Sequence, residues 1–135
     1  MAFDLVRNLA GFPANPVAYP LTAGESFTKG DLVKISSGKI TKAAAADTAV
    51  FGVMAETVTA AATGTTYGLV YDNPLNVYRA PYTGTGTPVF GATRSIATSQ
   101  TVDADSATGG QVVTVLAVDS VNKTVDVVIT KHILN

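Results

Sequence analysis

The sequence predicts an all-β protein, a compact β-barrel or β-tulip-like sandwich with an extended N-terminal arm. From Gly24 onward, short β-prone runs are separated by Gly, Pro, Asn and Asp. The last of these runs alternates apolar and polar residues with the period of two that a half-buried strand shows. Before them, the prolines of residues 1–20 disfavour helix. We therefore expect an arm, residues 1–20, and a single β domain, residues 21–135.

The arm is rich in large apolar residues for a segment that lacks strand alternation. Asp4 is placed to cap a short helical turn that ends at Gly11. The apolar side chains either pack on their own domain or dock on a partner. Because Asp4 and Arg7 interrupt the apolar start, we expect no export signal. As interface candidates the arm supplies Phe3, Leu5, Val6, Leu9 and Phe12.

The β domain is expected to contain eight strands. A tight hairpin turn at Ser37-Gly38 joins the first two, because Gly accepts the positive φ of such turns. The alanine-rich residues 43–46 are too few for a stable helix and are predicted as a loop. The predicted strands are 31–36, 39–42, 50–57, 66–72, 75–80, 88–97, 111–119 and 123–132.

The last two predicted strands differ in their patterning. In the final strand, Val125, Val127 and Ile129 point one way and polar residues point the other, so one face is core. Strand 111–119 is apolar on both faces. We expect it to be central, or to meet a partner with its second face.

Composition excludes several classes of function. The chain has ten acids, nine scattered bases and no cysteine. A nucleic-acid groove needs clustered bases, and a membrane span needs about 20 apolar residues, so neither partner is expected. A surface rich in Thr, Ala, Gly and Val suits coverage by another protein.

The sequence marks no catalytic, cofactor or metal site, and we expect a protein that is not an enzyme. His132 is the single histidine and is expected to face solvent or an interface. The glycine repeat of residues 83–88 lacks the helix that a phosphate cradle needs. Asp103 and Asp105 match a calcium loop poorly, since Ala107 and Thr108 replace expected ligands and glycine. A small β-barrel hydrolase is kept as a remaining alternative.

The tyrosines cluster between residues 67 and 82. Tyr67 and Tyr71 share a strand face with Leu69 and are expected to be buried or at the rim of the core. A sugar-binding tyrosine platform is the alternative. The interface candidates from this region are Tyr78, Arg79 and Tyr82, a composition enriched at protein interfaces.

Roughly half of the chain resembles the decoration, or cement, proteins of tailed-bacteriophage heads. The closing hairpin VVTVLAVDSVNKTVDVVI is similar to the way such domains end. Residues 75–110 have no counterpart in the resemblance. The other matching features are Ala23-Gly24 before Phe27, Lys29-Gly30-Asp31-Leu32-Val33, the Ser37-Gly38-Lys39 hairpin, the alanine-rich link to Ala46-Asp47, and Phe51-Gly52-Val53.

This resemblance implies a homotrimeric virion protein on the capsid exterior, made in the host cytoplasm. It would bind the major capsid protein and brace the lattice without any cofactor or catalytic residue. A head-fibre or spike domain that binds a host receptor or glycan is the alternative.

Overall fold

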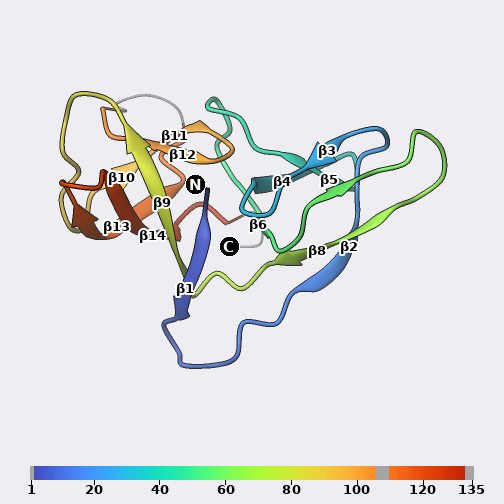
Figure 1. The fold of residues 1–135 in the computed structure, drawn as a ribbon, viewed down its shortest axis with the longest axis horizontal. Coiled ribbons are helices and arrows are strands. Elements are labelled where there is room, and N and C mark those ends of the chain that lie inside the picture. The colour runs from blue at the N-terminus through green and yellow to red at the C-terminus, as the bar shows by residue number, and fades with distance from the viewer. Residues whose placement is uncertain (1, 106–109, 133–135) are drawn as a thin grey trace.

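The computed structural model describes residues 2–105 and 110–132, and every regular element in these ranges is a β-strand (Figure 1). This confirms the predicted all-β class. The strands are β1 (Asp4–Asn8), β2 (Val17–Pro20), β3 (Ser26–Phe27), β4 (Leu32–Ser36), β5 (Lys39–Lys42), β6 (Gly52–Met54), β7 (Val58–Thr59), β8 (Tyr67–Tyr71), β9 (Asn76–Thr83), β10 (Thr93–Arg94), β11 (Ile96–Thr98), β12 (Thr101–Asp103), β13 (Val113–Asp119) and β14 (Thr124–Ile129).

The larger sheet is a nearly closed barrel. Its seven strands follow the order β10-β13-β14-β9-β12-β11, with β1 also paired to β9. The two ends of this path, β10 and β11, are separated in the chain by Ser95 alone, so the ends of the sheet lie next to each other. Pairing is antiparallel except between β12 and β9. The predicted barrel is therefore confirmed.

The smaller sheet curls in the same manner. Its five strands follow the order β2-β8-β6-β4-β5, and a parallel bridge between Leu21 and Ile40 joins the two ends. The N–H of Thr22 also donates to the carbonyl of Ile40 at 2.9 Å. The β4–β5 turn is the predicted hairpin, since Ser37 and Gly38 both have positive φ, 51° and 76°.

Each sheet encloses an apolar core, and the two cores meet. Valines of β13 and β14 fill the larger core together with Tyr78 and Tyr82 of β9 and with Leu32 and Val53 of the smaller sheet. The smaller core lies around Phe27, Phe51 and Val70. The larger core is therefore completed by side chains of the smaller sheet.

A β-bulge explains why strand β13 is apolar on both faces. Register shifts between Val115 and Ala117, so Leu116 is an extra residue opposite β14. Val113 and Val115 point into the barrel before the bulge, and Val118 packs against the core after it. The strand lies between β10 and β14, which confirms the expectation that it is central in its sheet.

The extended N-terminal arm is not confirmed. Residues 4–8 form β1 on β9, where a helical turn was expected, and residues 17–20 form β2 on β8. Phe3 is 2% exposed and lies in the larger core. A register shift between Leu5 and Arg7 breaks the period of two, which is why the sequence shows no strand pattern there.

Segment 88–97 does not form the single strand that was expected. It contains β10 and only the start of β11, and these pair with different strands of the barrel. Val89 and Phe90 precede β10 as exposed residues, 63% and 77%. Short strands β3, β7 and β12 were not predicted, because two or three residues carry no measurable period.

Candidate partner-binding surface

The predicted interface residues divide into exposed and buried groups. Leu5 is half-buried, whereas Phe3, Tyr78 and Tyr82 are buried in the larger core. These three side chains are therefore not available to a partner in the folded protein. Four of the eight are exposed: Val6, Leu9, Phe12 and Arg79.

The burial of Tyr78 and Tyr82 follows from the alternation of β9. Tyr78, Ala80 and Tyr82 point into the barrel, and Arg79 points out. Burial raises the pKa of the Tyr78 phenol well above its usual range. The sequence does not predict the burial of these tyrosines. β9 also buries Val77, so its residues do not alternate regularly between apolar and polar.

A buried amide pair fastens β1 to β9 beside Tyr78. The Asn8 amide donates to Oδ1 of Asn76 at 2.9 Å, and the Asn76 amide donates to the Tyr78 hydroxyl at 3.3 Å. Oδ1 of Asn8 accepts the N–H of Ala10 at 2.9 Å. Sequence reasoning missed this chain of bonds, because the two asparagines are 68 residues apart.

Arg79 lies in an open hollow of about 590 Å³ on the outer face of the barrel, together with Asp119 and Asp126. Its guanidinium donates to both carboxylate oxygens of Asp126, at 2.8 and 3.1 Å, and this pairing raises the pKa of Arg79. The carboxylate of Asp119 caps the β13–β14 turn by accepting N–H groups of Val121 and Asn122. The charges in this hollow are therefore already paired within the protein.

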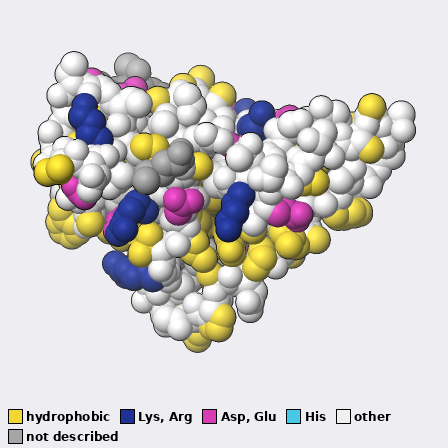
Figure 2. Space-filling model, in the orientation of Figure 1, with side chains coloured by type: hydrophobic (Ala, Val, Ile, Leu, Met, Phe, Trp, Pro, Cys, Tyr) yellow, Lys and Arg dark blue, Asp and Glu magenta, His cyan; other side chains and the backbone are white. Residues whose placement is uncertain are grey.

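A surface of large apolar side chains lies where the two sheets are connected. We call it the lower apolar surface, and it consists of Leu9, Phe12, Val17, Leu69 and Leu75, exposed by 48, 68, 45, 39 and 44%. Figure 2 shows hydrophobic side chains gathered along the lower side of the molecule, beneath β1 and β8. The sequence predicted two of the five, Leu9 and Phe12.

Two contacts bring this surface together from distant parts of the chain. The N–H of Leu9 donates to the carbonyl of Leu75 at 2.9 Å. β2 pairs with β8, so that Ala18 lies opposite Leu69 and the exposed Val17 is the next residue along β2. No family profile matches the chain, and no curated protein matches it. The candidate surface is therefore defined by its geometry alone.

The exposed face of β8 corrects the prediction for Tyr67, which was expected in the core or at its rim, whereas the half-buried Tyr71 packs at the rim of the larger core. Tyr67 is 62% exposed and Leu69 is 39% exposed. The inner face of β8 is formed by Gly68 and Val70 instead. A Cβ at Gly68 would lie 2.8 Å from a methyl carbon of Leu21, so glycine permits the close packing that turns the tyrosine outward.

His132 is buried, 4% exposed, contrary to the expected solvent or interface position. Its Nε2 lies 3.1 Å from the carbonyl oxygen of Asp72, and its ring packs 5.5 Å from that of Phe51. A parallel bridge between Val50 and His132 places it where the chain leaves β14 for the smaller sheet. The sequence suggested exposure because the residue lies near the end of the chain.

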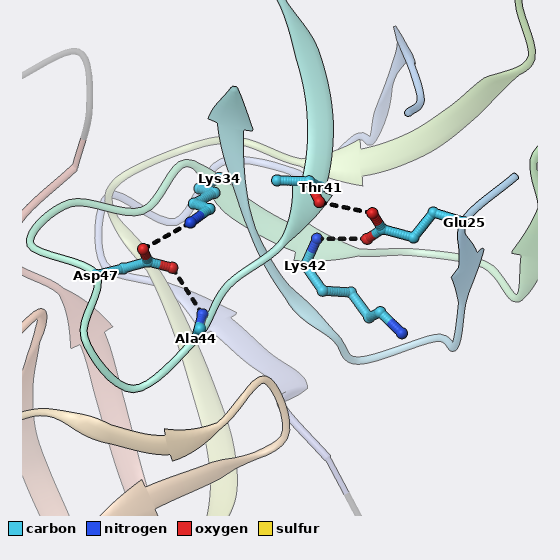
Figure 3. A network of polar contacts seen from close by, with 6 residues as sticks. All are labelled: Glu25, Lys34, Thr41, Lys42, Ala44 and Asp47. Carbon is cyan, nitrogen blue, oxygen red and sulfur yellow. Dashed lines mark hydrogen bonds and ion pairs between the residues drawn. The ribbon is translucent and has the colours of Figure 1, made fainter. Parts of the chain in front are cut away.

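Two carboxylates near β5, Glu25 and Asp47, accept hydrogen bonds from the backbone and from neighbouring side chains. Figure 3 shows Glu25 accepting from Thr41 and from the N–H of Lys42, at 2.6 and 2.7 Å. In the same view Asp47 accepts from Lys34 and from the N–H of Ala44, both at 2.6 Å. These bonds hold the loop after β5, which is irregular as predicted.

Asp105 holds the glycine loop of residues 84–86. It accepts N–H groups of Thr85 and Gly86, both at 2.6 Å, and these bonds lower the pKa of its carboxyl group. Asp103 accepts the N–H of Asp105 at 3.0 Å. The other positions of the considered calcium loop, Ala107 and Thr108, lie outside the described residues.

Within residues 2–105 and 110–132, no group of three or more His, Asp or Glu side chains is arranged to hold a metal ion. The same ranges contain no helix long and apolar enough to cross a membrane.

Proposed function

We propose that this protein is a non-enzymatic virion component that binds the outside of a phage capsid and stabilises the lattice of the major capsid protein. The proposal includes assembly as a homotrimer and synthesis in the host cytoplasm. It is supported by the resemblance of residues 16–61 and of the closing hairpin to phage decoration proteins, together with the lower apolar surface.

The lower apolar surface is the observation that carries the proposal. Its five side chains are large, and each is more than a third exposed. Isolated apolar residues on a surface need no explanation, but a group of them gathered on one side marks an interaction site. Covering such side chains stabilises a complex by about 25 cal/mol per Å² of apolar area.

The same surface is held in place before any partner arrives. Besides the bond from Leu9 to Leu75, the N–H of Gly11 donates to the carbonyl of Asn8 at 3.0 Å. Pairing of β2 with β8 holds the backbone that carries Val17 and Leu69. A preorganised surface loses little conformational entropy on binding, so more of the burial energy appears as affinity.

Homotrimer formation rests on the family resemblance. The strand that suggested it, β13, uses Val113 and Val115 in its own barrel. Light scattering of the free protein and imaging of decorated heads measure the stoichiometry. A monomer in both states contradicts the trimer, whereas a monomer only when free is compatible with assembly on the capsid.

A head-fibre or spike domain that binds a host receptor or glycan is the second candidate. The outward side chain of Tyr67 on β8 favours this function, and the half-buried Tyr71 lies on the same face. A tyrosine ring can stack on a sugar ring. The test compares binding of the purified protein to empty heads, to host cells and to a glycan array. Binding to heads alone supports capsid decoration, and binding to cells or glycans without heads supports the receptor role.

A further inference from the structure

Strand β1 is an edge of the larger sheet. Among the described strands it pairs with β9 only. The residue before it, Phe3, donates its N–H to the carbonyl of Gly30 at 3.0 Å, away from β9. Because backbone groups alternate along a strand, the N–H and C=O of Leu5 point to this same outer edge. A bulge at Val6 and exposed charges at Asp4 and Arg7 limit nonspecific pairing there.

A pocket of about 360 Å³ opens beside this edge. Phe3, Leu5, Met54 and Tyr71 supply its apolar lining, and Phe3 and Met54 belong to the two cores. In Figure 1, β1 lies between the larger barrel and the strands of the smaller sheet. The pocket is therefore built from both sheets.

The remaining lining residues of the pocket are Asp4 and Lys29, and both are exposed. The ion pairs found in the described residues are Lys34–Asp47 and Arg79–Asp126, so neither of these charges is used in one. The pocket thus combines an apolar centre with a free negative and a free positive group.

We propose that the β1 edge and this pocket bind an extended segment of the major capsid protein by strand addition. The segment's backbone pairs with Leu5, and one large apolar side chain enters the pocket. A basic residue of the segment lies beside Asp4 and an acidic residue beside Lys29. This inference rests on the proposed capsid function and names the contact within it.

The geometry favours an extended peptide over a small ligand or a helix. A cavity of 360 Å³ is near the lower end of the range for small-molecule sites, and one side is an open strand edge. A helix satisfies its backbone bonds internally and gains nothing from free N–H and C=O groups. A strand uses both the edge and the pocket.

The first experiment measures the affinity for purified empty heads of the full-length wild-type chain, Asp4→Lys, Lys29→Glu, and the control Lys123→Glu on the β13–β14 turn. Both test residues are exposed, so melting temperatures should match the wild type. We expect each pocket variant to bind at least about tenfold more weakly, with the control unchanged.

The second experiment maps the contact with a photocrosslinker on a single introduced thiol, which is straightforward because the chain has no cysteine. Lys29→Cys should crosslink to one extended capsid segment that carries a large apolar residue, and Lys123→Cys should not. Crosslinks between two copies of this chain would show that the edge holds a second subunit and would overturn the inference.

The two proposals fail in different ways. If the wild type binds heads, while the pocket variants bind as tightly and Lys29→Cys gives no capsid crosslink, the strand-addition site is wrong and the capsid function stands. If the wild type does not bind heads, the capsid function fails and this inference fails with it.

Discussion

Phe3 donates its backbone N–H to the carbonyl of Gly30 at 3.0 Å, and its ring lies in the larger core at 2% exposure. The turn before β4 and the start of the chain are therefore fastened together. Gly30 has φ of +93°, and a Cβ there would lie 2.6 Å from Cβ of Ala2. Glycine at this position lets the N-terminal segment lie against the turn.

Because Phe3 is buried in the larger core, the N-terminal segment should contribute to the stability of the fold. We predict that Phe3→Ala lowers the free energy of unfolding by about 3 to 5 kcal/mol, as for other buried Phe residues. The matched control Phe12→Ala removes a side chain that is 68% exposed and should change it by less than about 0.5 kcal/mol. Urea titration measures both. Equal and small effects would mean that the buried Phe3 side chain contributes little to the stability of the fold.

Asp31 is a buried carboxylate within the Lys29-Gly30-Asp31 motif, and it connects distant loops. It accepts from the N–H of Thr28 and the amide of Gln100, both at 2.8 Å, and from the hydroxyl of Ser99 at 3.1 Å.

We predict that Asp31→Ala destabilises the fold by about 2 to 4 kcal/mol, because three donors lose their partner in a partly buried place. Asp4→Ala, at an exposed acid, is the control and should be near neutral. Thermal melts report the difference. A loss below about 1 kcal/mol for Asp31→Ala would mean that water replaces the carboxylate without cost.

Asp105 should make stability depend on acid pH. Its pKa is lowered in the folded state by the N–H groups of Thr85 and Gly86, so its contribution is present above the pKa of the unfolded chain, near 4. That contribution is lost as the pH falls through the lower pKa that Asp105 has in the folded state. Asp105→Asn should therefore destabilise the protein at pH 7 and converge with the wild type at pH values below the lowered pKa of Asp105, where the carboxyl group is protonated. Melts across pH 2 to 7 test this, and parallel curves for the two proteins would contradict it.

The lower apolar surface should govern binding without governing stability. We predict that Leu69→Lys with Leu75→Lys weakens binding to empty heads at least about tenfold, since both side chains lose apolar contact and add charge. Val121→Lys, at a residue 90% exposed on the β13–β14 turn, is the control and should bind normally. Sedimentation with heads measures all of them. Unchanged binding of the double variant would show that another face of the protein contacts the capsid.

The class of fold and several of its local features can be predicted from neighbouring residues in the chain. Alternation in β14, the turn at Ser37-Gly38 and the irregular loop at residues 43–46 depend on neighbours in the chain. Period and turn chemistry act over a few residues, so they can be read without knowing the tertiary contacts.

Which apolar and aromatic residues face solvent depends instead on contacts between distant parts of the chain. Bulges at Val6 and Leu116 each shift the period of two, which hides β1 and makes β13 look apolar on both faces. Tyr67 is turned outward because Gly68 packs closely on Leu21, a contact between residues far apart in the chain. Leu9 meets Leu75, and Phe3 meets Gly30, through pairings of the same long-range kind. A surface built from such contacts has no period of its own, because its members come from separate strands that only folding brings together.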